Sequence, residues 1–161
     1  MLQLYAGVTS HYLDAFPMAE ESQMPSTLMD FVRKNGAPNY LMGDNAKVVF
    51  SKATQEILWQ YAIGLKTSEP HQQNQNPAER RIQDVKRTSN MIMDRTNTPA
   101  KFWLLCVLYV ILLSNHIAHA SLGNITPIEK AKGYRPDVSK FLQYRWFEPV
   151  YYLDTQKKGK R

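Results

Sequence analysis

The alternation of short strand-like runs with longer helical segments constrains the fold of this chain more than any other feature. Two runs rich in aromatic and branched residues, 2–8 and 11–17, are separated by Thr9-Ser10 and predict a hairpin. Apolar residues at helical spacing follow at 26–34, and further strand-like and helical segments alternate after them. Such alternation is typical of an α/β layer structure.

The remaining segments are bounded by turn and capping residues. We expect strands at 39–42, 63–67 and 146–153, a polar loop at 68–75, and helices at 51–61, 101–120 and 127–132, with a long helix from Asn76-Pro77 to Thr98-Pro99. The helix at 101–120 is apolar almost all round, so we expect it to be buried in the domain or against a partner.

No segment is long enough to span a membrane. The longest apolar run, Phe102 to Leu113, has twelve residues, whereas a bilayer span needs roughly 18. Trp59, Trp103 and Trp146 are expected in the core. A single cysteine, Cys106, excludes an internal disulfide and a cysteine-based zinc cluster.

One domain accommodates the chain, because 161 residues lie within the size of a single core. We expect a core domain at 1–153 and a basic tail at 154–161.

The charge is unevenly distributed along the chain. Positions before 77 hold seven acidic and five basic residues, a net charge of −2; the rest hold seven acidic and fifteen basic residues, a net charge of +8. Clustered Lys and Arg favour a polyanionic partner through counterion release. A soluble domain with a basic tail is the alternative explanation.

Two carboxylates stand at positions typical of a metal site in an α/β fold. Asp44 follows the expected strand at 39–42, at the sheet edge where such folds place ligands. Glu79 lies in the first turn of the long helix. Mg²⁺ prefers carboxylate ligands, and a pair of such ions can clamp both oxygens of a phosphoryl displacement. An ordinary turn at Asp44 and helix capping by Glu79 behind Asn76 explain the same residues without a metal.

The helix that carries Glu79 also presents polar and basic side chains. Gln83 and Lys86 follow Glu79 by four and seven residues, on the same helix face, and Arg80 and Arg87 flank them. A row of cations beside a metal-binding carboxylate is suited to a nucleic-acid strand. We therefore expect phosphate contacts from this face.

At these positions the sequence resembles the integrase core of copia-type retrotransposons, within the ribonuclease H-like superfamily. The resemblance covers roughly 1–153, and its motifs occur in the family's order. The motifs are Gly43-Asp44-Asn45, the block from His71 to Arg80, Trp103 to Leu113 followed by Asn115-His116, Ile125 to Glu129, and Trp146 to Tyr151. The resemblance implies a ribonuclease H-like α/β fold, with a mixed sheet flanked by helices.

The resemblance also implies DNA integration, with metal-dependent 3′-end processing and strand transfer on element ends and target DNA. Asp44 and Glu79 would be two of the acidic ligands of Mg²⁺, or of Mn²⁺. Lys86 matches a position where the family places a DNA-contacting lysine, while Gln72 and Gln73 would belong to the active-site loop. We also expect a nuclear location, or otherwise a cytoplasmic one. A homodimer formed through the helices is expected as well.

One departure from the family pattern concerns the first metal-binding Asp. In the family it lies on a strand before the hairpin, whereas this chain begins at the hairpin. That strand is central to the family's sheet, so its loss leaves two unpaired edges. Asp14 lies on the second hairpin strand and is not a substitute. We expect a truncated copy that binds any divalent cation weakly and is inactive alone.

Two other functions fit the same residues. A non-catalytic interaction or dimerisation module of a retroelement polyprotein would use the 101–120 helix as its interface and would leave Asp44 and Glu79 without a role. Another nuclease of the same fold is disfavoured by the His71 to Arg80 block.

His116 and His119 are three residues apart on a helix and favour a structural role over a metal site.

Overall fold

The computed structural model describes residues 1–43, 51–67 and 77–151. Four strands and five α-helices alternate along these segments. In chain order they are β1 (Leu2–Ala6), β2 (Leu13–Pro17), α1 (Met24–Asn35), β3 (Tyr40–Gly43), α2 (Lys52–Gln60), β4 (Gly64–Thr67), α3 (Pro77–Thr96), α4 (Trp103–His116) and α5 (Pro127–Lys132). Short 3₁₀ turns lie at Glu21–Gln23, Ala100–Phe102, Ala120–Leu122 and Ser139–Leu142. The expected α/β layer structure is confirmed.

Local capping signals set the ends of several helices. α1 has a proline in its first turn and stops at Gly36, whose φ of 86° is strained for residues with a Cβ. The Ser51 side chain accepts a hydrogen bond from the Thr54 N–H at the start of α2. Thr126 caps α5 in the same way. These boundaries follow from residues that are visible in the sequence.

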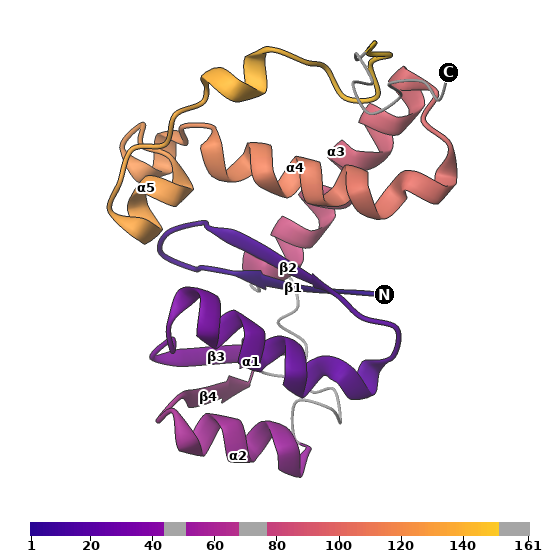
Figure 1. The fold of residues 1–161 in the computed structure, drawn as a ribbon. Coiled ribbons are helices and arrows are strands. Elements are labelled where there is room, and N and C mark those ends of the chain that lie inside the picture. The colour runs from indigo at the N-terminus through magenta and orange to yellow at the C-terminus, as the bar shows by residue number, and fades with distance from the viewer. Residues whose placement is uncertain (44–50, 68–76, 152–161) are drawn as a thin grey trace, which may run out of the picture.

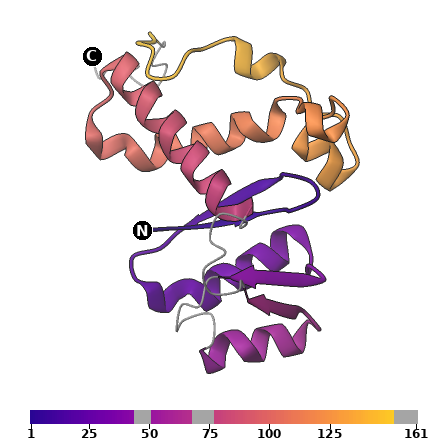
Figure 2. The same ribbon diagram turned by 180° about the vertical axis from the view of Figure 1, so that it is seen from behind.

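The described strands form two separate pairs. β1 and β2 are antiparallel, with Gln3 opposite Phe16, and β3 and β4 are parallel, with Leu41 opposite Leu65. Figure 1 shows the pairs one below the other in the order β2, β1, β3, β4, and Figure 2 shows the same order from behind. No described strand pairs with β1 on the side away from β2, or with β3 on the side away from β4.

Two hydrophobic cores lie on opposite sides of the β1–β2 hairpin, because alternate residues of a strand point to opposite faces. One core joins the hairpin to α1, α2 and the residue before β4, and contains Tyr5, Leu28, Val32, Leu58 and Ile63. The other joins it to α3 and α4, and contains Leu13, Val85, Val110 and Ile111. In Figure 1 the hairpin accordingly runs between α1 on one side and α3 with α4 on the other.

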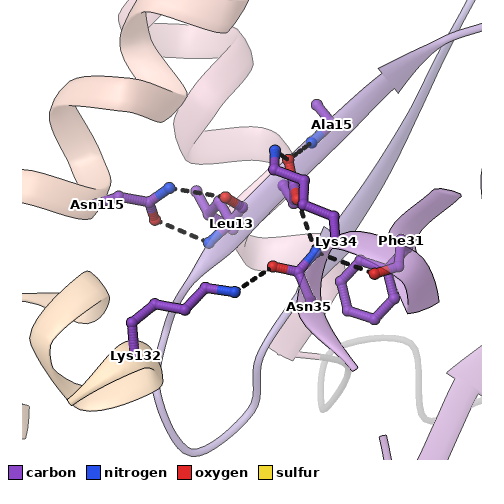
Figure 3. Close-up of polar contacts among 8 residues, drawn as sticks. Leu13, Ala15, Phe31, Lys34, Asn35, Asn115 and Lys132 are labelled. Carbon is purple, nitrogen blue, oxygen red and sulfur yellow. Dashed lines mark hydrogen bonds and ion pairs between the residues drawn. The ribbon is translucent and has the colours of Figure 1, made fainter. Parts of the chain in front are cut away.

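Hydrogen bonds of polar side chains connect β2 to α4 on one side and to α1 on the other (Figure 3). Asn115 of α4 accepts a hydrogen bond from the Leu13 N–H at 2.8 Å and donates to the Leu13 carbonyl at 2.7 Å. Asp14 accepts hydrogen bonds from Lys34 Nζ and Asn35 Nδ2 of α1, each at 2.8 Å. Because Asp14 is buried and hydrogen-bonded to α1, it contributes to the packing of the hairpin.

The expected terminal strand at 146–153 is wrong over its described part. Residues 146–151 contain no strand. Their order comes from side chains: the Trp146 indole N–H donates to Thr98 Oγ1 at 3.0 Å, and its ring lies 5.0 Å from that of Tyr109. Anchoring by an aromatic ring replaces strand pairing in this segment.

The expected burial of two tryptophans in the core is also wrong. Trp59 is 89% exposed and Trp103 is 45% exposed. On α4, Leu105 and Leu112 are 54% and 39% exposed, whereas Cys106, Val110 and Ile111 are buried, so the domain buries part of this helix surface. No described helix is long and apolar enough to cross a bilayer.

Candidate nucleic-acid interface

The N-terminal half of α3 forms the candidate interface. Pro77 begins the helix, where its missing N–H leaves no helical hydrogen bond unmade, and Glu79 follows in the first turn. The expected cap, Asn76, lies outside the described residues. α3 packs against β1 and α4, so its other faces are open to solvent.

One face of α3 carries a polar row at helical spacing. Glu79, Gln83, Lys86 and Asn90 are all exposed. Gln83 Nε2 donates to Glu79 Oε1 at 2.8 Å, which holds the carboxylate against the helix and leaves its second oxygen outside this bond. No described residue forms an ion pair with Lys86. The predicted grouping of Glu79 with Gln83 and Lys86 therefore exists in the fold.

The flanking arginines are exposed as well. Arg80 has no ion-pair partner among the described residues, and Arg87 lies 3.7 Å from Asp84. The Arg87 and Asp84 side chains are 79% and 51% exposed, so water screens this pair and it contributes little to stability. Both guanidinium groups are accessible to an anion.

Arg81 is turned toward the hairpin and away from this row. Its guanidinium lies 2.6 Å from His11 Nδ1. Burial lowers the pKa of His11, and the neighbouring Arg81 and His119 charges lower it further. The imidazole therefore favours the neutral form, in which Nδ1 accepts a hydrogen bond from Arg81.

Three predicted site residues, Asp44, Gln72 and Gln73, lie outside the described residues. Their approach to Glu79 stays a prediction, although Asp44 directly follows β3 as expected. Within the described parts of the chain, no three His, Cys, Asp or Glu side chains lie close enough together to hold one metal ion. His116 Nδ1 contacts the Leu112 carbonyl of its own helix at 2.7 Å.

A cavity of about 650 Å³ lies beside the polar row, between β1, α3 and α4. Glu79 and Lys86 line it, together with Leu2, Gln3, Leu4, Ile82, Val85, Ser89, Asn90, Met93, Trp103 and Val107. Ser89 is 2% exposed, and its hydroxyl has no hydrogen-bond partner among the described residues. No motif in the sequence marks Ser89 as a cavity residue, because its burial depends on how α3 packs in the fold.

Comparison with known proteins finds matches in structure only. No family model matches the sequence, and no curated protein matches it. The HTLV-2 integrase catalytic core domain, solved in complex with magnesium in a trimeric form, superposes with a TM-score of 0.66 at 16% identity. The match covers 81% of this chain and 83% of that core.

Two further structures extend the likeness. The dimeric form of the same HTLV-2 core gives a TM-score of 0.61 at 16% identity over 81% of this chain and 83% of that one. A chain of the simian T-cell lymphotropic virus intasome, solved with the PP2A regulatory subunit B56 gamma, gives 0.63 at 15% identity. That match covers 94% of this chain and 54% of the intasome chain, so the present chain spans about half of it. The protein has the ribonuclease H-like α/β fold of integrase catalytic cores.

Proposed function

We propose that this chain is the catalytic-core fragment of a retroelement integrase of the copia type. In this proposal it binds the element ends and the target DNA through α3, and does not carry out DNA integration by itself. The exposed row that starts at Glu79 and includes Lys86 is the observation that carries the proposal. It lies on a fold shared with integrase cores, and its charge suits a phosphodiester backbone.

Electrostatics favour a nucleic acid as the ligand of this face. Lys86 and Arg80 are exposed cations without an ion-pair partner among the described residues, and Arg87 has only a weak one. A phosphate that displaces solvent ions from such cations gains free energy from counterion release. The chain from position 77 onward carries a net charge of +8, which extends the attraction beyond these three side chains.

Fewer described residues support metal binding than support DNA binding. The HTLV-2 core is solved with magnesium, whereas the described residues here offer one suitable carboxylate, Glu79. Mg²⁺ bound by protein carboxylates commonly uses one or two of them and keeps several waters. We therefore propose weak binding of Mg²⁺ or Mn²⁺ by Glu79 with Asp44, and we derive no catalytic step from it.

DNA binding is tested by fluorescence anisotropy of a labelled duplex at several salt concentrations. We expect Lys86→Gln to weaken binding and to reduce the slope of log affinity against log salt by about 1. The matched control is Lys52→Gln, because Lys52 is an exposed lysine on α2, which lies far from α3 in Figure 1. An unchanged slope in Lys86→Gln would remove the α3 assignment.

Metal binding is tested by thermal melting with increasing MgCl₂. We expect a small rise in Tm that disappears in Asp44→Asn and in Glu79→Gln. Asp30→Asn is the control, because Asp30 is exposed on α1 and its ion pair, with Arg33, lies within the same helix. Strand transfer by the purified chain would contradict the inactivity part of the proposal.

A second candidate function is a dimerisation module, and the exposed apolar side of α4 favours it. Leu105 and Leu112 are seven residues apart, share one face of the helix and are both exposed. A partner helix would remove this surface from water. Sedimentation velocity distinguishes the candidates: a dimer that Leu105→Lys dissociates, in a chain that does not bind the labelled duplex, would support the module.

A further inference from the structure

The turn between β1 and β2 is fastened to α3 by a side-chain contact. Within the turn, the His11 N–H donates to the Gly7 carbonyl and the Gly7 N–H donates to the Tyr12 carbonyl, each at 2.8 Å. The His11 backbone is left-handed, with a φ of 58°, which is uncommon for a residue with a Cβ. Its imidazole lies against α3, where an Arg81 guanidinium nitrogen is 2.6 Å from His11 Nδ1. Figures 1 and 2 show this turn at the end of the hairpin near α5.

The loop after α4 reaches the same turn. The ring of His119 in this loop meets the ring of His11 edge to face, with their centroids 5.0 Å apart. Ser121 Oγ lies 2.7 Å from His119 Nδ1 and 3.4 Å from His11 Nδ1. The loop is folded around His119, whose N–H donates to the Ile125 carbonyl and whose carbonyl accepts from the Asn124 N–H, each at 3.1 Å. Two imidazoles from distant segments therefore share one contact.

Each imidazole faces a donor at Nδ1, and this determines its protonation state. A guanidinium can only donate, so His11 Nδ1 must present a lone pair to Arg81. The Ser121 backbone N–H donates to His119 Nδ1 at 3.2 Å, so that nitrogen must present a lone pair as well. An imidazolium carries a proton on both nitrogens and can accept neither bond. The arrangement therefore requires two neutral histidines.

The charges around the two rings oppose their protonation. A cavity of about 60 Å³ lies beside them, and its charged or titratable lining residues are His11, Arg81, Asp84 and His119. From α5, Lys132 approaches the turn, with its Nζ 5.5 Å from the centre of the Tyr12 ring. Burial lowers the pKa of His11, and the Arg81 and His119 charges lower it further. Acid would therefore place imidazolium charges beside an existing cation.

Asp84 offers Arg81 another partner once His11 is protonated. It follows Arg81 by three residues on α3, a spacing at which helix side chains can pair. Its present ion pair, with Arg87 at 3.7 Å, is exposed and contributes little. Arg81 can thus exchange an imidazole for a carboxylate on its own helix. The turn would then lose its side-chain contact with α3.

We propose that His11, His119 and Arg81 form a pH-sensitive latch, which holds the hairpin turn against α3 and the 117–126 loop at neutral pH and opens in acid. Because the pKa of His11 is lowered in the fold, the stability from its neutral ring is complete above about 6.5, the value of a free histidine. That stability is lost as the pH falls below this value. The core residues Leu13 and Val110 line the same cavity, so opening exposes this end of the core.

The test uses NMR on the full chain without DNA at pH 7.5 and pH 5, because histidine titrates across this interval. At pH 7.5 we expect both rings to carry their proton on Nε2, as imidazole nitrogen shifts report, and to show a ring-to-ring NOE. At pH 5 we expect this NOE to weaken at least about fivefold as the open form becomes dominant. The NOE between His116 and Phe141 is the internal control. His116 Nδ1 contacts the Leu112 carbonyl, and an imidazolium can also make that contact.

Asparagine at positions 11 and 119 keeps an acceptor that does not titrate. It tolerates the left-handed backbone at position 11 and is a good capping residue at position 119. We expect His11→Asn combined with His119→Asn to remove most of the fall in Tm between pH 7.5 and pH 5, whereas His116→Asn should leave this fall unchanged. Arg81→Gln should raise the midpoint of the His11 titration, because it removes a neighbouring charge. Arg80→Gln, at an exposed neighbouring arginine, should not.

Three results would overturn the proposal. The first is an NOE between the His11 and His119 rings that keeps its intensity at pH 5. The second is a proton on Nδ1 of either ring in the neutral chain. The third is an acid fall in Tm of the same size in the asparagine double variant as in the parent. No readout involves DNA, so failure of the proposed function and failure of this inference are distinguishable.

Discussion

The two edges of the β1–β2 hairpin differ in how their backbone groups are satisfied. At the β2 edge, Asn115 binds the N–H and the carbonyl of Leu13, and Pro17 has no N–H to satisfy. At the β1 edge, the outward groups of Leu2, Leu4 and Ala6 meet no described partner. As far as the described residues go, the hairpin is therefore closed on the β2 side and open on the β1 side. The candidate interface on α3 and the cavity both lie on the open side.

The largest expected effect comes from removing the Asn115 side chain, which binds the Leu13 backbone at the β2 edge. Asn115→Ala would leave a buried N–H and a buried carbonyl without partners, so we expect a loss of about 2–4 kcal/mol in the free energy of unfolding. Urea denaturation measures it. Ser114→Ala is the control, because Ser114 is the adjacent polar residue on the same helix α4. Equal losses in the two variants would contradict the closing role of Asn115.

The second effect is a loss of stability at high pH, and it depends on Tyr5, a buried residue of β1. Burial raises the pKa of Tyr5 to about 12, although a hydrogen bond with Thr27 offsets part of the rise. The folded state therefore retains the phenol proton longer than the unfolded chain, whose Tyr pKa is about 10. Stability from this difference is complete below pH 10 and is lost as the pH rises toward 12.

We expect the free energy of unfolding to fall by about 2–3 kcal/mol over that pH interval, and Tyr5→Phe to remove most of this fall. Guanidinium unfolding at pH 9 to 12 measures it. Tyr144→Phe is the control, because Tyr144 is 64% exposed. An alkaline loss of the same size in Tyr5→Phe would show that other groups cause it.

A smaller effect separates the inward and outward N–H groups of β1. Gln3→Pro removes an N–H that the register pairs with Phe16, whereas Leu2→Pro removes one that points away from β2. We expect Gln3→Pro to cost about 1–2 kcal/mol more than Leu2→Pro, which corresponds to one lost ladder bond with its unsatisfied acceptor. Thermal melting compares the two variants. Equal costs would contradict the assigned edge.

The smallest effect is a gain in stability on the open side. Ser89→Ala removes a buried hydroxyl that no described residue hydrogen-bonds, so we expect the free energy of unfolding to rise by about 1 kcal/mol. Ser114→Ala again corrects for the difference in helix propensity between Ser and Ala. A loss of stability in Ser89→Ala would show that the hydroxyl is satisfied in solution.

Much of this fold follows from local sequence signals. The hairpin, the helix that stops before Gly36, the start of α3 at Pro77 and the capped α5 are all confirmed, because each depends on residues close in sequence. The strand predicted at 146–153 failed because Trp146 contacts Thr98 and Tyr109, which are distant in sequence. Contacts of that kind leave no periodic signal.

The candidate site was predictable only in part. Helical spacing placed Glu79, Gln83 and Lys86 on one face, and the structure agrees. The hydrogen bonds between Asn115 and Leu13 join residues 102 positions apart, so no local sequence pattern predicts them. The free hydroxyl of Ser89 depends on how α3 and α4 pack beside β1, which composition does not determine. Asp44 stays a prediction for a metal ligand.

Residue-resolved hydrogen exchange of the chain alone tests the difference between the two edges most directly. The account predicts slow exchange at the Leu13 amide, which Asn115 binds, and exchange at least about tenfold faster at the Leu4 and Ala6 amides. Equal protection at all three amides would contradict it, because β1 would then already have a partner on its outer side.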